Sequence, residues 1–305
     1  MSTGSTEDDG PGPEGAAAEG VAADGAGADG ARGDEPGTDG SGTLRRRVLD
    51  AALRLVERAG GLAVRAEALP FDAVLREAGV SRTSAYREWP GRDAFHADVL
   101  HELAGPAWQG SGGFDQGTVR LLRGAVAARL PELRTAEGRA RVVREVVRLG
   151  ARHSYEHLRD SVQWRTSVAL TATVLGLPDP VQRDRVRAAL DASEQASLEL
   201  MTRVYADLFL VLGLRLRPGV PSAATVALAG AALVEGFAWR GVLAPEGDDA
   251  MLVVPGPDGP EEWHPVALAF LGLVEGLVEP DPDHDAETAL RLYLTSLADQ
   301  EAGRG

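Results

Sequence analysis

Along most of the chain after residue 43, apolar side chains recur every three or four positions, which is the period of a helix with one buried face. In the first such helix the apolar positions are Val48, Ala52, Leu55, Val56 and Ala59. Two glycines follow at 60 and 61, and glycine favours the end of a helix. The pattern therefore predicts a first helix that starts near residue 43.

Two short helices joined by a glycine are predicted next. The first covers residues 71–78 and is followed by Gly79. Ser81 is a good N-cap for the second, which must end by Pro90 because proline cannot continue a helix. A fourth helix is expected from about residue 92, and the stretch 105–113, rich in glycine and proline, predicts a boundary after it.

The remaining residues also follow the helical period, so the ordered part of the chain is predicted to be all-α. A strand-like string, 251–254, is expected to be a loop or a short hairpin arm. We therefore expect a helical head at 44–104 and a larger helical domain at 105–305. The helices expected in the larger domain are 118–130, 136–158, 162–175, 181–214, 222–243, 265–278 and 285–297.

Composition changes this picture mainly at the N-terminus. Residues 1–43 are rich in Gly, Ala, Asp, Glu and Pro and nearly free of large apolar side chains, so this tail is expected to be disordered. The net charge of the chain is −15, and only residues 44–104 carry basic and acidic side chains in nearly equal number. The acidic tail is either an inert solvated segment or a competitor with DNA for the adjacent Arg45, Arg46 and Arg47.

Composition also bears on the cellular location of the protein and on the kinds of chemistry that its side chains can perform. The chain has no cysteine, which excludes disulfides, thiolate metal sites and cysteine nucleophiles. The acidic N-terminus lacks the apolar segment of a signal peptide, and the longest apolar stretch, 223–234, is too short to span a bilayer. The expected location is therefore the cytoplasm.

The second short helix of the head has two different faces. Ala85 and Trp89 are apolar, and Val80 just before the helix adds to that side. The opposite, polar face consists of Arg82, Thr83, Tyr86 and Arg87. Arginine is the commonest bidentate partner of guanine edges, and hydroxyl groups suit phosphate oxygens. Both a DNA-reading helix and an ordinary helical hairpin with a polar outer face fit this pattern.

The string Ala-Gly-Val-Ser-Arg-Thr-Ser-Ala-Tyr-Arg-Glu-Trp-Pro at 78–90 resembles the turn and recognition helix of the TetR family of transcriptional regulators. The strings at 48–53 and 91–95 are also similar to that family, so the resemblance covers about 60 residues. Two substitutions depart from the family pattern. Glu88 stands where a His is common, which would place negative charge near DNA, and Ala85 stands where a larger Leu is common. The segment 61–70 is also longer than is usual in the family.

The resemblance implies a set of DNA contacts. Ser84 and Tyr86 would hold backbone phosphates, and Ser81 belongs to the same DNA-facing turn. The run Arg45, Arg46 and Arg47 would form an N-terminal arm that enters the minor groove. The positions that would face base edges or phosphates are those of Arg82, Thr83 and Arg87.

The resemblance also implies a homodimer and a small-molecule effector. The helices Ser222–Leu243 and Pro265–Val278, rich in small and apolar residues, would meet their symmetry mates in a four-helix interface, or else belong to the core. Arg165 is a candidate partner for an anionic ligand. The candidate pocket walls, which are core or interface aromatics in the alternative reading, are Trp108, Phe114, Trp164, Tyr205, Phe209 and Trp239.

Other functional patterns are weaker. His153 and His157 have the i, i+4 spacing of two zinc ligands on a helix, but the sequence supplies no evident third ligand. Asp281, Asp283, His284 and Asp285 form either a cation site or a solvated acidic turn. No cofactor is expected. The leading interpretation is a dimeric, ligand-responsive repressor that binds a palindromic operator. The rivals are a ligand-sequestering or protein-interaction module that keeps the head, and a metal-dependent helical enzyme.

Overall fold

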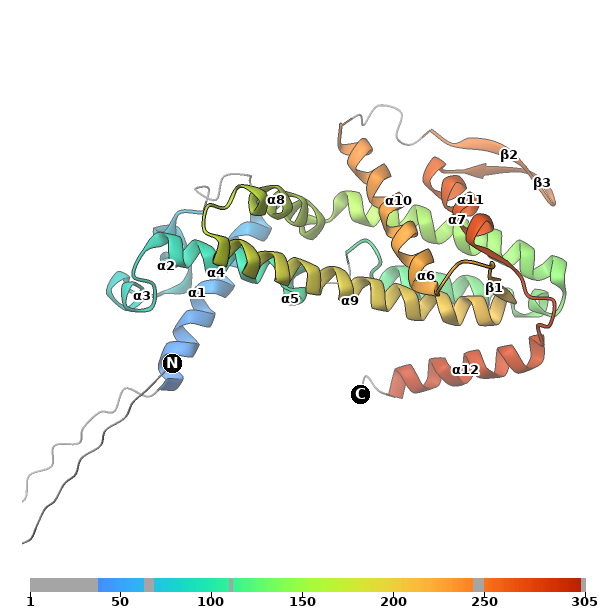
Figure 1. Cartoon of the computed structure of the whole chain (residues 1–305), viewed down its shortest axis with the longest axis horizontal. Coiled ribbons are helices and arrows are strands. Elements are labelled where there is room, and N and C mark those ends of the chain that lie inside the picture. Colours follow the sequence, from blue (N-terminus) through green and yellow to red (C-terminus); the bar gives the residue numbers. More distant parts are fainter. Residues whose placement is uncertain (1–37, 63–68, 110–111, 244–249, 303–305) are drawn as a thin grey trace, which may run out of the picture. The chain divides into compact units, whose positions relative to one another are not determined.

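The computed structural model describes residues 38–62, 69–109, 112–243 and 250–302 (Figure 1). This described part is mostly helical, as the sequence predicts, and it also contains two small antiparallel sheets. The helices are α1 (Thr38–Arg58), α2 (Phe71–Ala78), α3 (Arg82–Glu88), α4 (Arg92–Ala104), α5 (Pro106–Gln109), α6 (Gln116–Ala127), α7 (Ala136–Asp160), α8 (Val162–Gly176), α9 (Pro180–Leu212), α10 (Ala223–Leu243), α11 (Pro265–Leu277) and α12 (Ala286–Ala302), with a 3-10 turn at Leu130–Arg134. The strands are β1 (Leu214–Leu216), β2 (Leu252–Gly256), β3 (Gly259–Trp263) and β4 (Val278–Pro280).

Each helix expected from the period is present, and most of the predicted ends differ by only one to three residues. The N-terminal boundary is wrong, because α1 begins at Thr38 and residues 38–43 of the expected tail are helical. Extending an existing helix costs much less than starting one, so the amphipathic part of α1 can carry these polar residues. Residues 1–37 of the tail lie outside the described residues.

The short helices α2 and α3 end where the sequence predicts. Gly79 follows α2 in the left-handed region with φ of 64°, and its N–H donates to carbonyls at the end of the helix. The Ser81 hydroxyl accepts a hydrogen bond from the Ser84 N–H at 3.2 Å and so caps the start of α3. These two caps fix a tight turn between the helices.

The apolar core around α1–α4 continues into α8 and α9. Leu170 and Val174 of α8, with Val186 and Ala189 of α9, belong to the same buried cluster as Trp89. The Ser193 hydroxyl of α9 donates to the carbonyl of Ala104, the last residue of α4, at 2.7 Å. The head is therefore joined to α8 and α9 by a shared buried cluster, while the larger helical region has two further buried clusters of its own.

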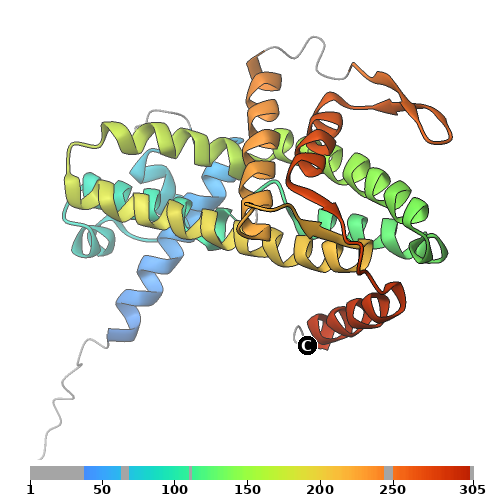
Figure 2. The same cartoon turned by 45° about the vertical axis from the view of Figure 1, so that its right-hand side comes forward.

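The rest of the described structure is built around α7 and α9. α7 packs against α6, α10 and α11, while α9 packs against α4, α10 and α12 (Figures 1 and 2). β1 follows α9 and pairs with β4, which follows α11, so the ends of these two helices are tied together. β2 and β3 form a hairpin, which confirms the hairpin-arm interpretation of the strand-like string at 251–254.

α10 is longer than the apolar stretch that the sequence suggested. Glu235 and Arg240 do not end it, and by length and composition alone its 21 residues could cross a membrane. The expectation that this segment is too short is therefore wrong. In this structure α10 packs against α7, α9 and α11, as a core helix of a helical protein does.

Candidate functional sites

The first candidate site is the exposed face of α3. The predicted polar residues Arg82, Thr83, Tyr86 and Arg87 are all exposed. On the opposite side, Ala85 and Trp89 are buried in the core of the head, as predicted. The helix thus presents a continuous polar surface while its apolar side fixes its orientation.

A buried carboxylate positions α3 from behind. Asp98 of α4 is only 6% exposed, and its Oδ2 accepts a hydrogen bond from the Trp89 indole at 2.7 Å. The same carboxylate binds Arg45 of α1 and, at 2.9 Å, Arg185 of α9. The ring of Phe95 also meets the Trp89 ring edge to face, with centroids 5.5 Å apart. Asp98 therefore links α3 to three other helices.

The arginines at 45–47 do not form an arm, which corrects the expectation from the family resemblance. They lie inside α1, because this helix extends back to Thr38. Arg45 binds Glu88 at 2.8 Å and stacks on Trp89. Arg46 pairs with Asp50, and Arg47 donates to the backbone carbonyl of residue 78. All three side chains contact the head itself.

Glu88 also differs from expectation. Its carboxylate pairs with Arg45 and is mostly shielded, so its charge is balanced within the protein and is not directed toward a partner. On the exposed face, Arg82 pairs with Asp72 at 2.8 Å, and the Tyr86 ring packs against Phe71. Arg87 has no ion pair with any residue that the structure describes.

The second candidate site is a cavity of about 150 Å³ enclosed mainly by α6–α11. It brings together four of the aromatic residues that the sequence proposed as pocket walls. Phe270 of α11 is a further aromatic wall, which sequence reasoning did not single out. The four residues are Phe114, Trp164, Tyr205 and Phe209.

Three proposed pocket residues lie elsewhere. Trp108 packs against the core of the head, and Trp239 is 48% exposed with its ring 6.5 Å from that of Trp164. Arg165 is exposed and donates to the backbone carbonyls of Gly60 and Arg159. Successive residues of a helix point in different directions, so the neighbour of the wall residue Trp164 faces away from the cavity. The anionic ligand expected through Arg165 therefore has no partner there.

Sequence reasoning missed the charged residues of this cavity, Glu194 of α9 and Glu235 of α10. Both residues are exposed to solvent as whole residues, but protein atoms crowd the Glu235 carboxyl group. This burial, together with the nearby charge of Glu194, raises the pKa of Glu235 to about 7. A signal was available, because Glu235 is an acidic residue within a long apolar helix.

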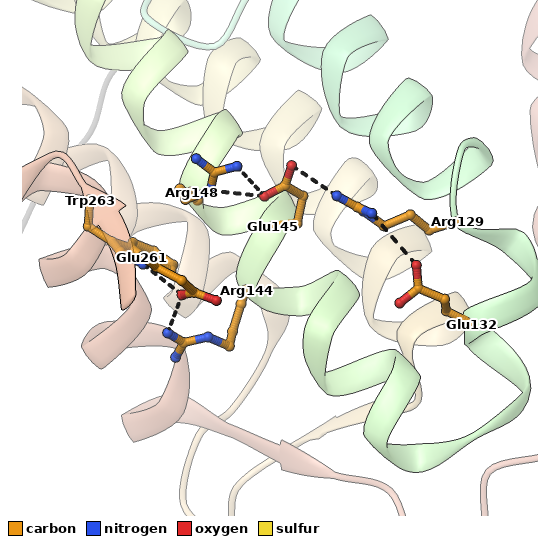
Figure 3. Close-up of polar contacts among 7 residues, drawn as sticks. All are labelled: Arg129, Glu132, Arg144, Glu145, Arg148, Glu261 and Trp263. Carbon is orange, nitrogen blue, oxygen red and sulfur yellow. Dashed lines mark hydrogen bonds and ion pairs between the residues drawn. The ribbon is translucent and has the colours of Figure 1, made fainter. Parts of the chain in front are cut away.

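A second cleft, of about 210 Å³, lies between α7 and the β2–β3 hairpin and is lined mostly by charged residues. Arg144 binds Glu261 at 2.6 Å and stacks on Trp263, whose indole also donates to Glu261 (Figure 3). The Glu145 carboxylate forms ion pairs with both Arg148 and Arg129 (Figure 3). Arginines and carboxylates balance here, and the contacts of Arg144 with Glu261 and Trp263 anchor the hairpin to α7.

The histidine pair and the acidic turn have structural partners. His153 and His157 each lie 4.0 Å from Asp115, a third residue that the sequence did not suggest. The Asp115 carboxylate caps α6 by accepting the Thr118 N–H at 2.7 Å. Within the described ranges, no three histidine or acidic side chains are arranged to hold a metal ion. In the acidic turn, Asp285 caps α12 by accepting backbone N–H groups.

Of the two helices expected to form a dimer interface, α10 leaves apolar surface uncovered, whereas the large apolar side chains of α11 are buried or partly buried. On α10, Leu228 is 55% exposed, and Trp239 and Leu243 are exposed farther along the helix. Ala232 and Gly236 lie between them at helical spacing and are also exposed. These five residues form a stripe of apolar and small side chains along one side of α10.

Comparison of this chain with protein-family models, with curated proteins and with solved structures gave no match.

Proposed function

We propose that this chain is a dimeric, ligand-responsive transcriptional regulator of the TetR type. In this proposal α2 and α3 form a helix-turn-helix whose second helix enters the major groove. The observation that carries the proposal is the division of α3 into an exposed polar face and a buried apolar face. The buried face is held by Trp89 and Asp98, so the polar face has a fixed orientation.

The exposed groups of α3 match the two kinds of DNA contact. Ser84 and Tyr86 carry hydroxyl groups that suit phosphate oxygens and would set the register of the protein on DNA. Arg82, Thr83 and Arg87 would contact base edges or further phosphates. Arg87 is the strongest candidate, because it has no competing ion pair within the described ranges.

The uncovered stripe on α10 supports a two-fold dimer. Small and apolar residues such as Leu228 and Gly236 let two helices approach closely and exclude water. A dimer built on α10 and α11 would present two α3 helices to two half-sites, which suits a palindromic operator. The expected location of such a regulator is the cytoplasm.

The contacts of α9 suggest how ligand binding could reach the head. Ser193 lines the ligand cavity and also donates a hydrogen bond to Ala104 at the end of α4. Arg185, on the same helix, binds Asp98 behind α3. A ligand that shifts α9 would therefore act on the head through both the Ser193–Ala104 hydrogen bond and the Arg185–Asp98 ion pair. It would favour a dimer with a different half-site spacing. This mechanism gives a repressor that releases its operator.

The test is to select bound fragments from the source genome with the purified protein and to measure their affinity at several salt concentrations. A regulator should bind a subset of fragments and lose affinity steeply as salt rises. Arg87→Ala should weaken this binding while the dimer remains intact. Equal binding by the wild type and this variant would overturn the assignment of α3.

One observation favours a second function, sequestration of a ligand or partner without DNA binding. The arginines of the head are largely balanced by its own carboxylates, as for Arg45 with Glu88 and Arg82 with Asp72. A head of this kind has little positive charge to offer to phosphates. If no genomic fragment binds even at low salt while a ligand still binds the cavity, this second function is the correct one.

A further inference from the structure

The cavity enclosed mainly by α6–α11 is lined by two carboxylates and by no cationic side chain among the described residues. Glu194 and Glu235 are the charged residues among the described residues that line it; the others are apolar, hydroxyl, amide or glycine residues. Within the same described part, neither carboxylate forms an ion pair. Elsewhere in the molecule, carboxylates such as Asp98 and Glu261 are paired with arginines. The described lining residues of this cavity therefore supply two carboxylates and no cation.

Two carboxylates that face one crowded cavity disfavour each other's ionised form. The raised pKa of Glu235 reflects both the loss of water around the carboxyl and the charge of Glu194. A cation placed between these carboxylates would lower that cost, whereas an anion would add to it. The phenol of Tyr205 cannot take the cationic role, and its burial raises its pKa, so it stays neutral.

The other walls suit an organic cation better than a metal ion. Trp164, Tyr205, Phe209 and Phe270 supply aromatic surface, and aromatic faces attract ammonium groups. The side chains around them are mostly aliphatic, which disfavours a strongly hydrated inorganic ion. A cavity of about 150 Å³ has roughly the size that accepts one benzene ring.

We propose that this cavity binds a small lipophilic organic cation, an ammonium group attached to a hydrocarbon of about one aromatic ring. Glu194 and Glu235 would hold the ammonium, and the aromatic residues would hold the hydrocarbon. The inference deepens the proposed function by naming the chemical class of the effector. It replaces the anionic ligand that the sequence suggested through Arg165.

The first test compares three probes of similar size by isothermal titration with the full chain and without DNA. Benzyltrimethylammonium carries a fixed positive charge, 2-phenylethanol is neutral, and phenylacetate is an anion. We expect the cation to bind at least about tenfold more tightly than either of the others. Failure of the cation to bind, or equal binding of the neutral or anionic probe, overturns the proposal.

The second test removes each charge without changing shape. Glu235→Gln and Glu194→Gln should each weaken binding of benzyltrimethylammonium about tenfold, and neither should change binding of 2-phenylethanol. Glu199→Gln removes a carboxylate of α9 that does not line the cavity, so it is the control and should bind as the wild type does. Unchanged binding of the cation by both cavity variants would overturn the role of the carboxylates. Circular dichroism of each variant checks that it remains folded.

The third test uses the proton that Glu235 holds near neutral pH. A fixed cation favours the ionised carboxylate, so its binding at pH 6 should release protons and its affinity should rise between pH 6 and 8. Glu194 and Tyr205 are the other titratable groups that face the cavity from the described helices. The rise should be lost in Glu235→Gln, and a rise that persists in this variant would remove Glu235 from the site.

These measurements separate the inference from the proposed function, because none of them requires DNA. A protein that binds the cation but no genomic fragment would overturn only the regulator. A protein that binds its operator but none of the cation would overturn only the ligand class.

Discussion

Asp98 and Glu235 are both acidic residues of helices, but the protein surrounds them in opposite ways. Asp98 accepts hydrogen bonds from Arg45, Arg185 and the indole of Trp89, so its charge and its lone pairs are satisfied. Glu235 faces an apolar cavity together with a second carboxylate, and no arginine, lysine or histidine is among the described lining residues. The first arrangement stabilises the fold, and the second is costly unless a cation arrives from outside.

The cleft beneath the hairpin shows that a polar cavity alone does not indicate a ligand. Arg144 and Glu261 neutralise each other there, and Glu145 is shared by two arginines (Figure 3). The apolar cavity differs because its carboxylates have no such partners in the described structure. Unbalanced charge, more than volume, is thus the feature that separates a candidate binding site from a structural contact.

The largest expected effect comes from breaking the balanced cluster. Asp98→Asn should lower the free energy of unfolding by about 2–4 kcal/mol, because Arg45 and Arg185 would lose their buried partner. Asp93→Asn, on the exposed side of the same helix, is the control and should change stability by less than about 0.5 kcal/mol. Urea denaturation measures both variants. A loss for Asp98→Asn no larger than that for the control would show that the cluster does not stabilise the head.

The next largest effect is expected on operator binding. It compares two arginines of α3, Arg82, which forms an ion pair, and Arg87, which forms none with the described residues. Arg87→Ala should weaken operator binding by about 1–3 kcal/mol, because this side chain is free to contact bases or phosphates. Arg82→Ala should cost less, since Arg82 must first give up its pair with Asp72. Fluorescence anisotropy with a selected operator fragment measures both. A larger loss for Arg82→Ala would show that the Asp72 pair does not restrain Arg82.

Local patterns in the sequence predicted most of the helices and most of their ends, although the start of α1 and the short helix α5 were missed. Gly79 and Ser81 fix the turn before α3 through backbone conformation and a side-chain cap, which depend only on neighbouring residues. The division of α3 into buried and exposed faces follows from periodicity in the same way. Such features could be predicted because the residues that cause them lie within one or two helical turns.

Long-range contacts could not be predicted in this way. Periodicity does not reveal that Arg45 meets Asp98, or that Glu194 and Glu235 face one cavity from two different helices. Arg165 is next to the wall residue Trp164 in the sequence, but adjacent residues on a helix point in different directions, so Arg165 lies outside the cavity. The family resemblance suggested six aromatic wall residues, and four of them line the cavity.

Neutralising the Glu235 carboxylate should have a smaller effect on stability than Asp98→Asn, and of opposite sign. Crowding by protein atoms and the charge of Glu194 raise the pKa of Glu235 to about 7 in the folded protein, whereas its ordinary value in the unfolded chain is 4.5. Between these values the folded protein holds a proton that the unfolded chain has lost, so wild-type stability falls as pH rises. Glu235→Gln should remove this fall and should be more stable at pH 8, by about 1 kcal/mol or less after solvent screening.

Thermal unfolding of the two proteins from pH 4 to 8 measures the difference. The curves should coincide at the acidic end, where Glu235 is protonated in both states, and should separate above about pH 5. Glu199→Gln serves again as the control. A variant that is less stable than the wild type at pH 8 would mean that the Glu235 charge has a stabilising partner in the protein.

The smallest expected effect tests whether a paired arginine on the surface contributes to stability or to operator binding. Arg46 pairs with Asp50 at 2.9 Å and with Glu102 at 3.3 Å, but its side chain is largely exposed, so Arg46→Ala should change stability by less than about 0.5 kcal/mol. Because these acids already hold the guanidinium within α1, we also expect operator affinity and its salt dependence to stay nearly unchanged. A residue that contacts a phosphate would instead lower the salt slope by about one unit when it is removed. Such a fall for Arg46→Ala would show that α1 opens on DNA and that the run at 45–47 acts as an arm after all.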